Sequence, residues 1–362
     1  MMDQKRRRRD SAGDADDRSV TVEAPPNIAL IKYWGKADER LMIPLNDSVS
    51  LNIDCLHAMT TVRAVRREGD DSVAINGKNV DCGKRFQAAF QEARKLIGCS
   101  KWRFEVVSST NFPVAAGLAS SAAGFSAIAF AIGNLFDLPT EAITSIARYG
   151  SGSACRGVLP GLVQWQKGVH PQGEDCTAKS LFGPDYWPEL RAVILIVTGE
   201  EKETSSTDGM RITALTSGLM AERLRRNGEK IERLREAFAA RDFASLGDIV
   251  MRESNEMHDV CRDSVPKLHY MNSVSLAIVD AVHDFNEGGI RAAYTFDAGP
   301  NACIYLEEKN VAEWLSVVER RFDVDKEAAD RLGWSGGDSK EEKKGAIVDV
   351  IVSTVGRSPR VV

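Results

Sequence analysis

Two short segments carry basic and hydroxyl side chains close enough together to bind an anionic substrate. Lys32 and Lys36 stand four residues apart with Tyr33 between them, and ammonium groups this close repel unless an anion lies between them. In Gly150-Ser-Gly-Ser-Ala-Cys-Arg156, glycines and serines precede an arginine, which suits bidentate recognition of phosphate or carboxylate. Each segment also has a structural explanation: a surface turn anchored by Trp34, or a Gly/Ser loop with an exposed arginine.

A third segment, Asn111-Phe-Pro-Val-Ala-Ala-Gly-Leu-Ala-Ser-Ser-Ala-Ala-Gly-Phe-Ser126, has the composition of a phosphate-binding loop. It lies between a strand-like stretch at 103–109 and an alanine-rich run at 122–136 that is typical of a buried helix. Free N–H groups and the helix dipole make such a helix start an anion site, and short side chains let a phosphate approach. The segment alone is equally consistent with tight helix–sheet packing and a serine N-cap.

One carboxylate, Asp297, stands where a strand-like run gives way to the turn residues Ala-Gly-Pro-Asn. By itself it is a good turn former. The hydroxyl-rich stretch 203–210 reads as a helix entrance with several possible N-caps. His258 lies near the end of a long helical region, and we interpret it as structural.

The elements that must position these residues mix strands with helices. Periodicity and β-branched runs predict strands near 20–24, 45–56, 59–65, 72–75, 103–109, 161–165, 190–197 and 347–355. Helices are predicted over 85–97, 122–136, 141–148, 210–257, 273–285 and 311–321. Asn76-Gly77 predicts a hairpin turn, and the composition of 329–344 predicts a mobile loop.

The composition is that of an ordinary globular protein. The 362 residues suggest two domains, and a net charge of −5 gives no reason to expect nucleic acid or an anionic membrane as partner. No apolar run has bilayer-spanning length and no signal peptide is present, which favours a cytoplasmic protein. Seven scattered cysteines without a CxxC pair indicate reduced thiols. Residues 1–19, with a basic run at 5–9, are predicted to be a disordered, solvated tail.

Five segments together, in this order, resemble the mevalonate diphosphate decarboxylase family of the GHMP kinase superfamily: 26–36, 111–124, 150–156, 205–210 and 297–302. The glycine-rich loop indicates only the superfamily, whereas Ile-Lys-Tyr-Trp-Gly-Lys and Ser-Gly-Ser-Ala-Cys-Arg are specific for the decarboxylase. The resemblance covers about residues 20–355. It implies an α+β GHMP kinase fold, with two α/β-mixed domains at 20–188 (ATP-binding, ribosomal S5 domain 2-like) and 189–362 (ferredoxin-like), and the active site in the cleft between them.

The resemblance implies that ATP phosphorylates the 3-hydroxyl of (R)-5-diphosphomevalonate, after which phosphate and CO₂ leave to give isopentenyl diphosphate. Asp297 would orient or deprotonate the hydroxyl, Lys32 would polarise the reacting groups, and Arg156 would grip the substrate. Asn27 would lie beside the reacting carboxylate. Further substrate contacts are implied for Tyr33, Lys36, Ser151, Ser153 and Ser206.

The same resemblance implies a nucleotide site and an assembly. The expected contacts with ATP are Asn111, Pro113, Ala116, Gly117, Leu118, Ala119, Ser120 and Ser121, with Ser120 or Ser121 near Mg²⁺. Members of the family are commonly homodimers. Thr207 stands where some members have an arginine, so the resemblance does not determine which residues contact the substrate diphosphate near this position. Two alternatives are a GHMP kinase that stops at the phosphorylated product and a non-catalytic binding protein. Release of CO₂ would distinguish the decarboxylase from the kinase. The presence of Asp297, Lys32 and Arg156 argues against a non-catalytic binding protein.

Overall fold

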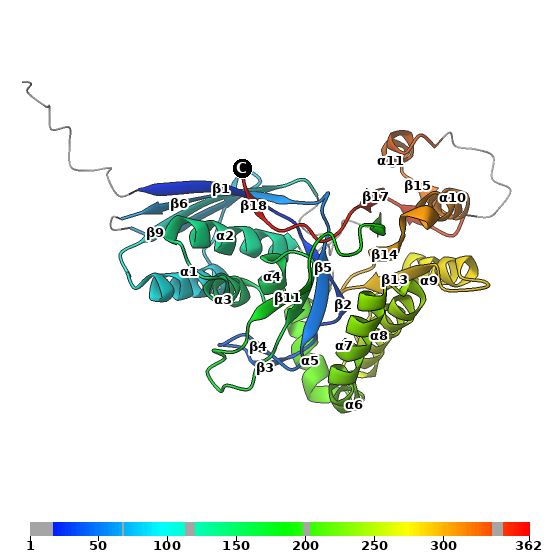
Figure 1. Cartoon of the computed structure of the whole chain (residues 1–362), viewed down its shortest axis with the longest axis horizontal. Helices are drawn as coiled ribbons and strands as arrows, with labels where there is room; N and C mark the ends of the chain where they lie inside the picture. The colour runs from blue at the N-terminus through cyan, green and yellow to red at the C-terminus, as the bar shows by residue number, and fades with distance from the viewer. Residues whose placement is uncertain (1–16, 67–68, 113–119, 198–202, 335–342) are drawn as a thin grey trace, which may run out of the picture.

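The computed structural model describes residues 17–66, 69–112, 120–197, 203–334 and 343–362. These residues form two halves that lie side by side, each with a sheet covered by helices (Figure 1). The observed mixture of helices and strands agrees with the predicted α+β class.

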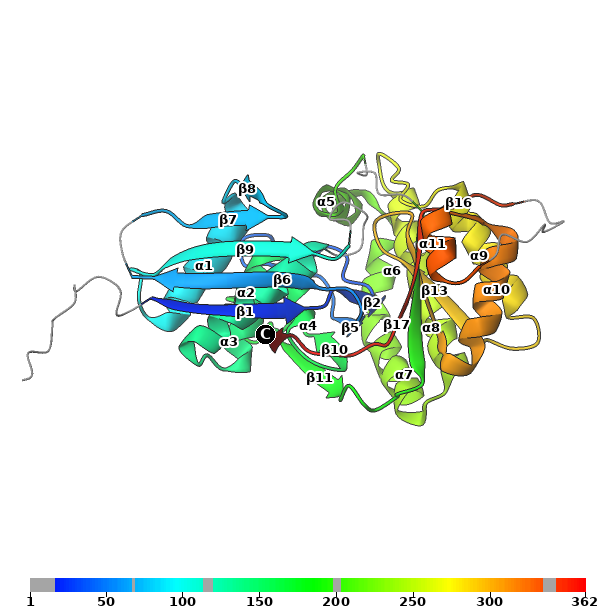
Figure 2. The same ribbon diagram turned by 90° about the horizontal axis from the view of Figure 1, so that it is seen from above.

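The N-terminal half is built on a six-stranded sheet in the order β18-β1-β6-β9-β7-β8. Buried and partly exposed residues alternate along its strands, so one face packs on helices and the other faces water. The alanine-rich helix α2 lies against β1 and β6, because its small side chains allow a close approach, and α1 and α3 pack beyond it (Figure 2). The strands are β1 (Arg18–Ala24), β6 (Ala58–Val65), β7 (Ser72–Ile75), β8 (Lys78–Val80), β9 (Arg103–Thr110) and β18 (Arg360–Val361). The helices are α1 (Lys84–Ile97), α2 (Ser120–Phe136) and α3 (Thr140–Gly150).

A smaller sheet, in the order β11-β10-β5-β2, lies between this layer and the C-terminal half (Figure 2). All residues of β2 and β5 are buried, and Ile28, Val49 and Leu51 share a core with the C-terminal strands. The sheet therefore joins the two halves. Its strands are β2 (Asn27–Ile31), β5 (Ser48–Asn52), β10 (Leu162–Trp165) and β11 (Ala178–Phe182), with the short β3 (Lys36–Asp38), β4 (Ile43–Pro44) and α4 (Ala154–Gly157) beside it.

The C-terminal half has a four-stranded sheet in the order β13-β14-β12-β17. The β-branched run at 190–197 forms β12, an inner strand, as predicted. The sheet strands are β12 (Leu190–Ile196), β13 (Ala292–Phe296), β14 (Ala302–Glu307) and β17 (Asp349–Ser353), and β15 (Asp323–Val324) pairs with β16 (Ala346–Ile347). The helices are α5 (Ser206–Thr216), α6 (Met220–Arg225), α7 (Asn227–Ala240), α8 (Phe243–Asp263), α9 (Ser273–Phe285), α10 (Val311–Arg321) and α11 (Lys326–Arg331), with the 3-10 turn η1 (Glu308–Asn310).

The chain end returns to the N-terminal half. After β17, the Gly356 carbonyl accepts from the Gly161 N–H and the Gly356 N–H donates to the Asn52 carbonyl, and β18 then pairs with β1. The last residues therefore lie on the N-terminal sheet, although they follow the C-terminal half in sequence.

Several local predictions need correction. The predicted loop at 329–344 begins inside α11, and 335–342 lies outside the described residues. The helical region 210–257 is four helices, interrupted at Ser217, at Arg226 and at Arg241, whose φ of 52° ends α7 in the left-handed region. The predicted tail 1–19 ends early, because β1 begins at Arg18; residues 1–16 lie outside the described residues. The turn at Asn76-Gly77 is confirmed, since both residues have positive φ (50° and 76°) between β7 and β8.

Candidate active site

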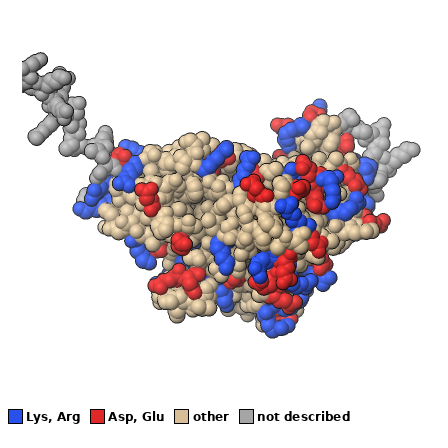
Figure 3. Space-filling view, in the orientation of Figure 1, with Lys and Arg blue, Asp and Glu red and all other residues tan. Residues whose placement is uncertain are grey.

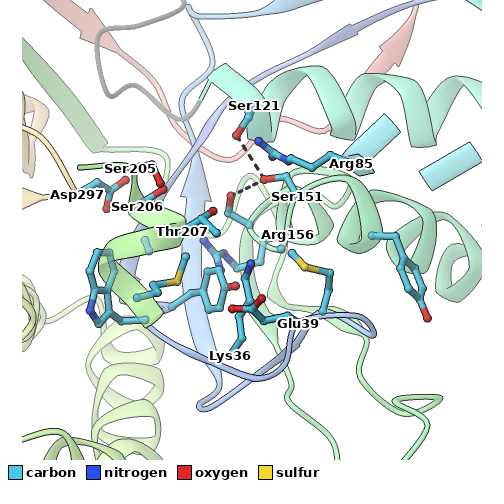
Figure 4. A pocket seen from close by; sticks show the side chains of 18 of the residues that line it. Lys36, Glu39, Arg85, Ser121, Ser151, Arg156, Ser205, Ser206, Thr207 and Asp297 are labelled. Carbon is cyan, nitrogen blue, oxygen red and sulfur yellow. Dashed lines mark hydrogen bonds between the residues drawn. The ribbon is translucent and has the colours of Figure 1, made fainter. Parts of the chain in front are cut away.

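A cavity of about 810 Å³ opens between the two halves (Figure 4). It is lined by side chains from β2, α1 and α4 on one side and from the start of α5 and the end of β13 on the other. Most of the predicted site residues meet here: Asn27, Lys32, Tyr33, Lys36, Ser121, Ser151, Ser153, Arg156, Ser206 and Asp297.

Lys32 and Asp297 form an ion pair in the wall of the cavity. Lys32 follows the fully buried strand β2, and Asp297 follows the fully buried strand β13. Lys32 Nζ lies 2.6 Å from Asp297 Oδ1, and the two side chains are 2% and 32% exposed. The ammonium is thus removed from water and held by one carboxylate, whose exposed part faces the cavity. This arrangement places a potential base, the Asp297 carboxylate, directly beside the positive charge of Lys32.

Arg156 is buried in the short helix α4 and is held by β5. Its Nε donates to Ser50 Oγ at 2.9 Å and its Nη1 to Ser48 Oγ at 2.6 Å. Burial lowers the pKa of Arg156, but from a value so high that the guanidinium stays charged at neutral pH. Two of its five donors are used by these serines, which fixes its plane and leaves other N–H groups for an anion in the cavity.

Three cavity side chains have buried polar atoms without a partner among the described residues. They are Nε1 of Trp34, the hydroxyl of Tyr33 and Oδ1 of Asn27. The Nδ2 of Asn27 donates to the Ser153 carbonyl at 3.0 Å. The Tyr33 ring packs edge-on against Trp165, and burial raises the pKa of Tyr33 well above its usual value, so its phenol keeps its proton. Buried polar atoms normally have partners, so the Tyr33 hydroxyl and the Asn27 amide oxygen are suited to a bound substrate.

Three serine hydroxyls form a row along the cavity. Ser121 Oγ is 3.4 Å from Ser151 Oγ, which is 3.5 Å from Ser153 Oγ (Figure 4). They come from the first turn of α2, the end of α3 and the start of α4. Hydroxyls donate and accept, so this row suits phosphate oxygens or a metal ion.

Opposite them, α5 begins at the cavity. Ser205 is its N-cap and accepts from the Asp208 N–H at 3.1 Å, which confirms the predicted helix entrance. Ser206 and Thr207 follow in the first turn and line the cavity. Thr207 is the residue for which the resemblance implies an arginine in some relatives; on the same helix, Arg211 pairs with Asp208 at 2.9 Å.

Lys36 lies at the lower edge of the cavity in Figure 4, beside Glu39. Burial lowers its pKa, partly opposed by Glu39. Gly35 before it has a φ of +98°, and a Cβ there would lie 2.5 Å from Leu45, so the turn that carries Lys36 requires glycine.

The predicted nucleotide contacts are less completely described. Pro113, Ala116, Gly117, Leu118, Ala119 and the side chain of Ser120 lie outside the described residues. Asn111 does not line the cavity: its Oδ1 accepts from the His57 N–H at 2.8 Å and its Nδ2 donates to the Cys55 carbonyl at 2.9 Å. In this structure Asn111 anchors the turn at 55–57, and its contact with ATP stays a prediction.

The sequence reasoning missed several lining residues, above all Arg85. Its Nε donates to the Gly150 carbonyl at 2.7 Å, and Figure 4 shows its side chain beside Ser121 and Ser151. A signal was available: Lys84 and Arg85 occupy the first turn of α1, which has no acidic residue, and cations there oppose the helix dipole unless an anion binds. Other missed lining residues are Ala29, Trp34, Glu39, Arg40, Met42, Ala88, Tyr149, Gly152, Ser205, Met210 and Met257.

His258 does not line the cavity. It is 3% exposed, and burial together with the positive charge of Lys32 lowers its pKa to about 3, so the imidazole is neutral, in agreement with a structural role. Within the described stretches, no group of three or more His, Cys, Asp or Glu residues could hold a metal ion. All seven cysteines are free thiols. None of the described helices is long and apolar enough to span a bilayer.

Comparisons with known proteins show the family to which the chain belongs. Residues 24–178 match the diphosphomevalonate decarboxylase-like N-terminal domain, and residues 192–362 match the mevalonate 5-diphosphate decarboxylase C-terminal domain. The diphosphomevalonate decarboxylase of Candida albicans is 39% identical over 94% of this chain and 97% of its own.

Solved structures show the same fold. Mevalonate diphosphate decarboxylase from Trypanosoma brucei has a TM-score of 0.87 at 33% identity, over 95% of this chain and 98% of its own. MDDEF in complex with MVAPP, AMPPCP and magnesium has a TM-score of 0.80 at 29% identity, over 96% and 99%. The chain belongs to the diphosphomevalonate decarboxylase family.

Proposed function

We propose that this chain decarboxylates (R)-5-diphosphomevalonate with ATP, giving isopentenyl diphosphate, CO₂, ADP and phosphate. The observation that carries the proposal is the Lys32–Asp297 pair in the wall of a cavity that also holds Arg156. A base, a fixed ammonium and a fixed guanidinium are the groups that phosphorylation of a hydroxyl beside a carboxylate requires.

In the first step, the Asp297 carboxylate takes the proton of the substrate 3-hydroxyl. The oxygen of that hydroxyl attacks the γ-phosphorus of ATP, and ADP leaves. Lys32, held 2.6 Å from that carboxylate, stabilises the negative charge that develops beside it. In the second step the C3–O bond breaks and phosphate leaves. The C–C bond to the carboxylate then supplies its electron pair to the new double bond, and CO₂ is released.

The substrate carries a carboxylate and a diphosphate, and the cavity offers matching groups. We assign the anionic ends to Arg156, Lys36 and Arg85, with Tyr33 and the serines 151, 153 and 206 as hydroxyl donors. The unpartnered Oδ1 of Asn27 lies on the same wall as Lys32 and is suited to orienting the reacting part of the substrate.

ATP is the second substrate, and Mg²⁺ would accompany it. The Ser121 hydroxyl, 3.4 Å from that of Ser151, lies at the start of α2 and offers an oxygen ligand of the kind Mg²⁺ prefers. The ion would neutralise charge on the nucleotide phosphates. Binding of AMPPCP and magnesium by a related decarboxylase supports this assignment.

The test is incubation of purified protein with ATP, Mg²⁺ and substrate carrying ¹⁴C in its carboxylate, with CO₂ and ADP measured together. Equal release of both products is expected. ADP without CO₂ would indicate the kinase alternative, and release of neither would overturn the proposal.

We further propose a cytoplasmic homodimer whose two domains divide near 188–189. The free cysteines fit a reducing compartment, and the two family matches end and begin on either side of that boundary. On the face shown in Figure 3, acidic and basic side chains are interspersed, which fits small-molecule partners better than nucleic acid. Light scattering after gel filtration tests the dimer.

A further inference from the structure

Helix α8 packs against β2 and β13, the two strands that lead to Lys32 and Asp297 (Figure 1). These strands belong to different sheets: β2 ends at Ile31 and β13 ends at Phe296. Lys32 and Asp297 are therefore the first residues beyond their strands, where the regular ladders stop. Something other than the sheets must set the distance between them.

The backbone of Lys32 is held on both sides by buried side chains. Its N–H donates to Glu253 Oε1 at 3.1 Å. Its carbonyl accepts from Arg223 Nη2 at 3.0 Å and from Asn46 Nδ2 at 2.9 Å. Side chains from α8 and α6 thus replace the missing ladder bonds at this residue.

Glu253 belongs to a charge cluster, which we define as Arg223, Lys230, Glu253 and Glu256; the first three are buried and Glu256 is 26% exposed. Glu253 is 0% exposed and contacts both Arg223 and Lys230, and Lys230 also lies 2.7 Å from Glu256. Burial by itself would raise the pKa of Glu253, but Arg223 and Lys230 outweigh it and the pKa is lowered, so the group is a carboxylate. Buried ion pairs stabilise a fold little compared with apolar residues of the same volume, so this cluster calls for another explanation.

The next residue on α8 holds the other strand. Phe296, directly before Asp297, donates its N–H to Ser254 Oγ at 3.0 Å. One turn further, on the same face of α8, the His258 ring packs edge-on against the Phe296 ring, with the ring centroids 6.3 Å apart. Ser254 is 0% exposed, so water cannot take its place.

We propose that Glu253 and Ser254 are positioning residues, which set the separation of the Lys32 ammonium and the Asp297 carboxylate by holding the backbones of Lys32 and Phe296. This rests on the proposed function, since the separation matters only if the pair handles the proton of the substrate hydroxyl. A displacement of about 1 Å in a reacting group costs on the order of 100-fold in rate.

The first test compares Glu253→Gln with Glu256→Gln in the full chain. Both remove one carboxylate charge from the same cluster, but only Glu253 contacts Lys32; Glu256 pairs with Lys230 and Arg226. An amide cannot pair with both Arg223 and Lys230, so the side chain should leave the position from which Oε1 accepts the Lys32 N–H. Glu253→Gln should therefore lower kcat for CO₂ release roughly 10- to 100-fold with KM for both substrates nearly unchanged. Glu256→Gln should keep kcat within about twofold of wild type.

The second test compares Ser254→Ala with Ser264→Ala. It can be carried out even if Glu253→Gln does not fold. Ser264 is also buried and follows α8, but its hydroxyl donates to the Cys261 carbonyl at 2.6 Å, away from the pair. Melting temperatures should fall similarly in both variants, whereas kcat should fall about tenfold only in Ser254→Ala.

The inference would be overturned by any of three results. These are equal losses of kcat within either pair of variants, a wild-type kcat in Ser254→Ala, or a change in KM with kcat unchanged. A wild-type protein that releases no CO₂ would instead refute the proposed function, so the two failures are distinguishable.

Discussion

Replacing Asp297 by asparagine tests the centre of the proposed chemistry. Asparagine has nearly the same shape and can still accept a hydrogen bond from Lys32, now 2.6 Å from the carboxylate. It cannot take a proton from the 3-hydroxyl. The variant therefore separates proton transfer from packing.

The expected losses differ in size. A general base contributes about 10²- to 10⁴-fold, which at 1.36 kcal/mol per tenfold corresponds to about 3–5 kcal/mol in activation free energy. Breaking a fully buried ion pair costs about 3–5 kcal/mol of stability, but the asparagine oxygen still accepts from the buried Lys32 ammonium and position 297 is 32% exposed to screening water, so about 2 kcal/mol or less is expected. Turnover should collapse while the protein stays folded.

The assay is kcat for CO₂ release, with ATP affinity by calorimetry and thermal unfolding on the same samples. The matched control is Asp259→Asn, because Asp259 forms an exposed ion pair with Arg262 on α8 and should leave kcat unchanged. A kcat for Asp297→Asn within tenfold of wild type, or a loss equal to its unfolded fraction, would refute the assigned role.

Three further predictions follow from single side chains. Arg156→Lys should lower kcat/KM by about 100-fold or more, because an ammonium cannot keep the bonds to Ser48 and Ser50 and also bind an anion in the same plane; unchanged kinetics would exclude Arg156 from the site. Tyr33→Phe should raise KM for diphosphomevalonate about tenfold without loss of stability, because its buried hydroxyl has no partner among the described residues; a lower melting temperature with unchanged KM would contradict this. The His258 pKa is lowered to about 3, so the unfolded state binds a proton that the folded state refuses, and the free energy of unfolding should fall as pH drops from about 6.5 towards 3. The loss from this group should reach about 2 kcal/mol at pH 5, and His258→Gln should remove it in urea titrations; an equally steep pH dependence in that variant would show that other groups cause it.

Part of the fold follows from local sequence signals. Helices α9 and α10 begin and end where periodicity and capping residues predict, and β12 follows from its β-branched run. These signals are local because a helix or strand buries one face of its own chain. Interruptions between consecutive helices were missed where no proline marks them, as at Ser217 and Arg241.

The candidate site is predictable as a set of residue types but not as a geometry. Arg85 was missed because its helix looks like an ordinary amphipathic one, and only the packing of α1 beside α3 brings it to Ser151. Asn111 belongs to the phosphate-loop pattern, yet its amide is occupied by the backbone of residues 55–57.

The sequence by itself determined the chemistry that is available: a carboxylate in a turn, two nearby lysines, an arginine after a Gly/Ser loop, and small residues at a helix start. Only the tertiary structure decided that Lys32 meets Asp297, 265 residues away, and that Glu253 and Ser254 hold the ends of both strands. The physical reason is that motifs and periodicity depend on neighbours along the chain. An ion pair between distant residues depends instead on tertiary packing. Here the packing of two sheets against one helix brings the ends of two strands together.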